Sequence, residues 1–93
     1  MKTKPIASID TAIRIYYTYP EIGNKEISEL FDLAGKQALS KYKKAVKEEQ
    51  VKRGVHTLRN FTVNTKVAYE VWGIDVEDLE VRRVKLKKLG MEA

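Results

Sequence analysis

Apolar side chains near the N-terminus recur at the spacing of an α-helix, in which positions i, i+4, i+7 and i+8 share one face. They are Ile9, Ile13, Tyr16 and Tyr17. Ser8 precedes them and can cap the helix, because its hydroxyl can accept from an unpaired backbone amide of the first turn. Pro20 ends the pattern, since the residue before a proline is displaced from helical backbone angles. The pattern predicts a first helix over residues 9–19.

Two more amphipathic helices are predicted next along the chain. The first of them is short, and its apolar residues lie at i, i+3 and i+4. These residues are Ile27, Leu30 and Phe31. Asn24 is in position to cap this helix. After an interruption at residues 32–35, a longer helix is predicted over residues 36–53, because Gly54 is a natural C-terminal stop.

The C-terminal third of the chain is predicted to hold an extended link and two helices. Residues 55–63 are rich in β-branched and aromatic side chains, which favour extended backbone, and no turn sequence folds them into a hairpin. Asn64 or Thr65 can open a fourth helix, which Gly73 ends. Asp75 can cap a fifth helix, whose acidic residues precede its basic residues, as the helix dipole favours.

Together these elements predict an all-α protein, a small helical bundle with a C-terminal helical extension. The 93 residues allow one small core. We expect a tri-helical domain over residues 5–54, an extended connector over residues 55–63, and a helix pair over residues 64–90. This pair either packs on the first part of the chain or mediates assembly.

The amino-acid composition excludes several kinds of functional site. Apolar residues make up 43% of the chain and charged residues 33%, which is typical of a soluble globular domain. The chain has no cysteine and a single histidine, His56, so disulfides, thiolate sites and histidine-rich metal cages are excluded. Neither a glycine-rich phosphate loop nor a nucleophile motif occurs, so we expect no enzyme and no cofactor. No long apolar run follows the N-terminus, and a cytoplasmic location without a membrane partner is expected.

Positive charge is concentrated on the predicted helix over residues 36–53. It contains seven basic and two acidic residues, so it alone accounts for the formal net charge of +5, and the rest of the chain sums to zero. At 100° per residue, Leu39, Tyr42 and Val46 share an apolar side. The opposite side gathers polar residues with long side chains. They are Lys36, Gln37, Ser40, Lys41, Lys44 and Lys47, with Lys43 at the boundary.

This part of the chain resembles the helix-turn-helix family of DNA-binding proteins, over about residues 8–54. The likeness rests on segments 24–31, 32–35 and 36–42. The family's buried, small and apolar anchor positions are filled by Ile27, Ser28, Phe31, Leu33, Leu39 and Tyr42. The sequence departs from the family at two points. Asp32 stands where a turn glycine is usual, and the spacing to Leu39 is one residue longer than in the commonest form.

The resemblance implies a sequence-specific DNA-binding protein that inserts the helix over residues 36–53 into the major groove of double-stranded DNA. It places Lys36, Gln37, Ser40 and Lys41 near base edges, and Lys43, Lys44 and Lys47 closer to phosphates. Residues 64–75 are also similar to small DNA-binding proteins of phages and mobile elements. The expected roles are those of a transcription regulator, a recombination accessory factor or a packaging-recognition factor.

A second interpretation stays open. The lysine-rich side can be an ordinary solvated surface, and the C-terminal helices can form a protein–protein assembly module. The apolar residues that suit such a seam are Val76, Leu79, Val84, Leu86 and Leu89. The two interpretations are compatible, because a protein with one recognition helix is expected to bind two half-sites as a homodimer.

Overall fold

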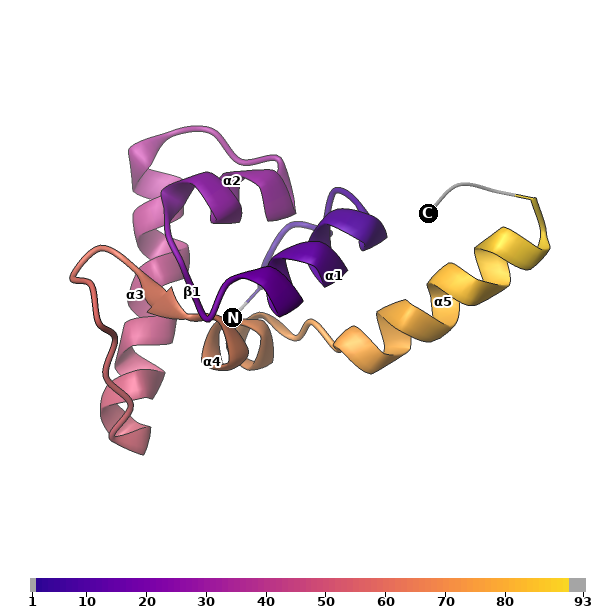
Figure 1. Ribbon diagram of the computed structural model, residues 1–93. Coiled ribbons are helices and arrows are strands. Elements are labelled where there is room, and N and C mark those ends of the chain that lie inside the picture. Colours follow the sequence, from indigo (N-terminus) through magenta and orange to yellow (C-terminus); the bar gives the residue numbers. More distant parts are fainter. Residues whose placement is uncertain (1, 91–93) are drawn as a thin grey trace.

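The computed structural model describes residues 2–90, which form five helices and one two-stranded antiparallel sheet (Figure 1). In chain order the elements are α1 (Ile9–Thr18), β1 (Glu21–Ile22), α2 (Asn24–Phe31), α3 (Lys36–Arg53), β2 (Val63–Asn64), α4 (Thr65–Trp72) and α5 (Val76–Lys88). The predicted all-α class is confirmed, since the chain folds into a compact, mostly helical small domain in which each strand has two residues.

Side-chain caps fix most of the helix starts where the sequence predicts them. The hydroxyl of Ser8 accepts from the backbone N–H of Thr11 at 3.3 Å, which caps α1. The side chain of Asn64 caps α4, and that of Asp75 caps α5. Each such cap satisfies amides that have no partner within the helix. The same residue types in the sequence therefore predicted these starts correctly.

The predicted cap of α2 is wrong. Asn24 is already helical, and Gly23 is the N-cap residue. The carboxylate of Glu26 accepts from the backbone N–H of Gly23 at 2.9 Å, as in a capping box. The side chain of Asn24 instead accepts from the ammonium group of Lys43 at 3.1 Å. A tertiary contact has therefore replaced the local cap.

The sequence predicted that the connector over residues 55–63 is extended throughout. The structure differs from this prediction. It bends at residues 58–61, and it ends in β2, which pairs with β1 in the register Glu21 to Asn64 and Ile22 to Val63. The two strands lie far apart in the sequence, so they are not joined by a hairpin turn that would predict their pairing. The sheet ties the end of the connector to the short link between α1 and α2.

One hydrophobic core joins the N-terminal helices to α4. Trp72 packs edge-on against Phe31, with ring centroids 5.3 Å apart, and its indole N–H donates to the backbone oxygen of Tyr42 at 3.3 Å. The hydroxyl of Tyr69 donates to the backbone oxygen of Ala12 at 2.6 Å. These contacts place α4 against both α1 and α3, and they fix the inner side of α3.

The last helix, α5, packs on α1 through its first two turns. Val76 and Leu79 are buried there, and Arg83 pairs with Asp10 at 3.5 Å. The C-terminal half of α5 extends away from the other helices, at the opposite end of the molecule from α3 (Figure 1). Within residues 2–90, no helix combines the length and the apolar character that crossing a bilayer requires.

Candidate nucleic-acid interface

The turn between α2 and α3 has a left-handed residue at its first position. Asp32 adopts φ 50° and ψ 49°, and aspartate is among the few residues other than glycine that tolerate this region. The Ser28 hydroxyl donates to the backbone oxygen of Leu33 at 2.6 Å, and the N–H of Leu33 donates to the backbone oxygen of Ser28 at 3.2 Å. Gly35 then opens α3 at φ 100°. Asp32 thus supplies the left-handed geometry for which glycine is the usual residue.

The inner side of α3 is held firmly. Leu39, Tyr42 and Val46 are buried, as predicted from their spacing. Gln50, which was not predicted to be part of this side, is buried one turn further along. Its side-chain oxygen accepts from the backbone N–H of Asn64 at 2.7 Å, and this bond joins α3 to β2. Packing and the part-buried hydrogen bond of Gln50 therefore fix which side of α3 faces solvent.

The opposite side of α3 carries the predicted site residues, and we call these seven side chains the lysine face. They are Lys36, Gln37, Ser40, Lys41, Lys43, Lys44 and Lys47. Six are exposed, and Lys43 is half-buried at the boundary. All seven belong to α3, which lies at one end of the molecule (Figure 1). The prediction that this side of α3 faces outward is therefore confirmed.

One flank of the lysine face is shaped by neighbouring elements. Lys43 donates to the side chain of Asn24, and Lys47 donates to the backbone oxygen of Asn60 at 3.2 Å. Burial lowers the pKa of Lys43, and the positive charge of Lys47 lowers it further. A shallow hollow lies along this flank between α3 and the N-terminus of α2. Its lining has four lysines, Lys36, Lys43, Lys44 and Lys47, against one carboxylate, that of Glu48, so the net charge of this flank is positive.

The C-terminal end of α3 contributes less free positive charge than the sequence suggests. The guanidinium of Arg53 pairs with Glu49 at 2.9 Å and with Glu70 on α4. Hydrogen bonds to these two carboxylates raise the pKa of Arg53, and the bond to Arg53 lowers that of Glu70. Arg53 is therefore neutralised by its partners, and the lysine face over residues 36–47 carries most of the positive charge of α3.

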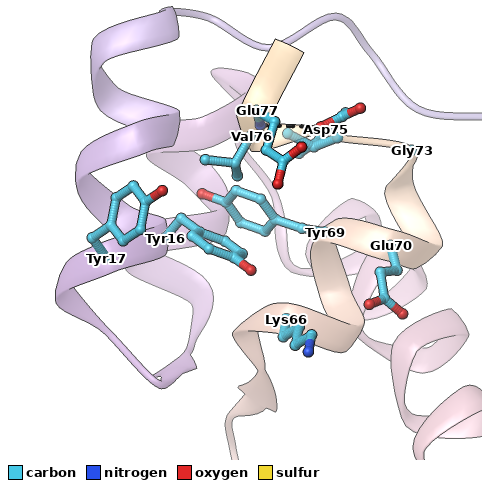
Figure 2. A pocket seen from close by; sticks show the side chains of 10 residues that line it. Tyr16, Tyr17, Lys66, Tyr69, Glu70, Gly73, Asp75, Val76 and Glu77 are labelled. Carbon is cyan, nitrogen blue, oxygen red and sulfur yellow. Dashed lines mark hydrogen bonds between the residues drawn. The ribbon is translucent and has the colours of Figure 1, made fainter. Parts of the chain in front are cut away.

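A second hollow lies between α1, α4 and the start of α5, and its chemistry is different. Figure 2 shows Tyr16 and Tyr17 from α1 facing Tyr69 from α4, with Asp75 and Glu77 at the rim. The Tyr16 ring centroid is 5.3 Å from that of Tyr17 and 5.0 Å from that of Tyr69. Burial raises the pKa of Tyr69. Carboxylates repel phosphate, so this hollow is unsuited to a nucleic-acid backbone. Packing accounts for Tyr69 and the half-buried Tyr16, whereas Tyr17 is exposed and donates to Glu80.

Comparison with protein-family models, with curated proteins and with solved structures found no match for this chain. Within residues 2–90, no three histidine, aspartate or glutamate side chains come together as a metal site.

Proposed function

We propose that this protein binds double-stranded DNA sequence-specifically by placing α3 in the major groove. The observation that carries the proposal is the lysine face, which is exposed on a helix whose other side is locked into the core. A major groove about 12 Å wide admits one helix, and its negative potential favours a cationic one. The helix pair α2 and α3, joined by the turn at Asp32, supports the resemblance to helix-turn-helix proteins.

The residues of the lysine face would take two kinds of role. Gln37 is the best candidate for reading sequence, because a glutamine amide can bond adenine N6 and N7 together. Lys36, Ser40 and Lys41 would lie near base edges beside it. Lysine ammonium groups act as compact charges and contribute affinity more than base preference. Lys43, Lys44 and Lys47 would contact phosphates, with Lys43 held in place by Asn24.

Assembly through α5 is a second candidate function that is compatible with the first. Val81 and Val84 are about half exposed, at 53% and 52%, and Leu89 is 72% exposed. Val76 and Leu79 are engaged with α1, so an intermolecular seam would use the distal half of α5. A homodimer formed there would present two copies of α3 to two half-sites. Proteins of this kind act as transcription regulators, recombination accessory factors or packaging-recognition factors.

The proposal is tested by fluorescence anisotropy with a labelled duplex across a salt series. If Lys43, Lys44 and Lys47 contact phosphates, log affinity should fall against log salt with a slope of about −2.7, at about −0.9 per contact. Replacing these three lysines together by alanine should bring the slope close to zero.

A matched control keeps the change in net charge the same and moves its position. It replaces Lys85, Lys87 and Lys88 of α5 by alanine. Both triple variants lose three positive charges, so a general loss of charge affects them equally. The proposal expects the α5 variant to keep nearly the full slope. Equal losses in the two variants, or a flat salt response of the unmodified protein, would contradict it.

A further inference from the structure

The connector loop, which we define as residues 56–61, presents two large apolar side chains to solvent. Leu58 is 97% exposed and Phe61 is 73% exposed. Single exposed apolar residues are common and need no explanation by themselves. Here two of them lie on one short loop. The hydrogen bonds that hold this loop and its position beside α3 indicate a binding surface.

A carboxylate from β1 holds the connector loop in one conformation. Glu21 accepts from the backbone N–H of Leu58 at 2.6 Å and from the hydroxyl of Thr62 at 2.7 Å, with a longer contact to the N–H of Arg59. We call these bonds the Glu21 clamp. The hydroxyl of Thr57 also donates to the backbone oxygen of Arg59 at 2.8 Å. The backbone that carries the exposed apolar side chains is thus already ordered in the folded protein. Binding a partner would therefore not incur the entropy cost of ordering this loop.

The connector loop lies beside the lysine face. It runs back from the C-terminal end of α3 alongside that helix to β2 (Figure 1), and the ammonium group of Lys47 donates to the backbone oxygen of Asn60. The segment from Gly54 to Lys66 contains no acidic residue, and Arg59 on the loop is exposed. The carboxylate of Glu21, which contacts the loop directly, is engaged in the clamp. The loop therefore extends the cationic surface of α3 past its flank.

We propose that the connector loop is a second DNA-contact element, which binds the backbone and the minor groove next to the major groove that α3 occupies. This inference rests on the proposed function. Arg59 would contact phosphate, and Leu58 and Phe61 would lie against the deoxyribose walls and base edges of the minor groove. Apolar side chains that enter minor grooves are a general way of gripping and bending a duplex. The acid-free segment and its continuity with the lysine face favour DNA over a protein as the occupant.

The test uses the full chain and one duplex that the unmodified protein has selected from a random pool. Affinity is measured by anisotropy, and the protected nucleotides are mapped by hydroxyl-radical footprinting. Replacing Leu58 and Phe61 together by serine should weaken binding roughly tenfold and remove protection at one end of the site. Arg59→Ala should reduce the salt slope by about 0.9. Both changes are at exposed positions, so the thermal melting of the free protein should stay the same.

A further variant tests the clamp without removing the contact residues. Glu21→Gln keeps Leu58, Arg59 and Phe61 but weakens the bonds that order them, so it should lose part of the affinity and of the same protection. Loop variants that bind and protect like the unmodified protein, while the triple lysine variant fails, would overturn this inference alone. Loop variants that change self-association but not DNA binding would also overturn it, in favour of a protein surface. An unmodified protein that binds no duplex would overturn the proposed function as well.

Discussion

Gln50 offers the sharpest test of how α3 is positioned. Its side-chain oxygen accepts from the backbone N–H of Asn64 at 2.7 Å, and the residue is only 6% exposed. Gln50→Ala would leave that amide without its partner. A buried donor left unpaired costs about 1–3 kcal/mol, and the removed side chain leaves additional unfilled space. We therefore expect the free energy of unfolding to fall by about 2 kcal/mol.

The assay is thermal or urea unfolding followed by circular dichroism. In a domain of this size, about 2 kcal/mol corresponds to a decrease in Tm of roughly 8–16 °C. Gln37→Ala is the matched control, because it makes the same substitution on the same helix at an exposed position. It should change stability by less than about 0.5 kcal/mol. Equal effects of the two substitutions on Tm would refute the reasoning that Gln50 is a buried link between α3 and β2.

Three further predictions concern the interface and its support. Gln37→Ala should relax base preference at one position of a selected site, whereas Lys44→Ala should weaken binding to all sequences alike and reduce the salt slope by about one unit; anisotropy on a panel of point-mutated duplexes separates the two. Asp32→Gly should preserve stability, whereas Asp32→Val should lower it by about 1–2 kcal/mol in urea unfolding, because a β-branched residue is strained in left-handed backbone. Hydrogen bonds from the Leu58 amide and the Thr62 hydroxyl lower the pKa of Glu21. The charged carboxylate therefore stabilises the fold at pH values above the ordinary pKa of glutamate, and this stabilisation is lost as the pH falls through the lowered pKa. Unfolding measured between pH 6 and pH 2 should show this loss, and a Glu21→Gln variant with the same acid dependence would contradict it.

Most helix positions followed from local sequence. The start of α1 at Ser8 and the end of α3 at Gly54 depend on side-chain caps and on glycine geometry, which act within a few residues. The exposed lysine face followed from helical spacing alone. The cap of α2 did not, because the side chain of Asn24 bonds to Lys43, 19 residues away. Which partner the Asn24 side chain bonds therefore depends on the tertiary structure.

The sheet and the connector loop could not be predicted for a similar reason. Each strand has two residues, and the partners β1 and β2 are brought together by the packing of the helices. The β-branched and aromatic residues of 55–63 predicted one extended link, whereas the structure bends it at residues 58–61 and exposes Leu58 and Phe61. Gln50 did leave a signal, because it continues the spacing of Leu39, Tyr42 and Val46 along the inner side of α3. A polar residue at such a position can be buried when a backbone amide lies opposite.

The packing of Trp72 makes it an intrinsic fluorescence probe of the fold. It is the only tryptophan of the chain, and its indole lies between Phe31 and the backbone of Tyr42 on the inner side of α3. Its emission should therefore shift when α3 separates from α4 and should change little when a ligand occupies the outer side. Intrinsic fluorescence can thus distinguish, in a single cuvette, a variant that has lost its fold from one that has lost only its ligand.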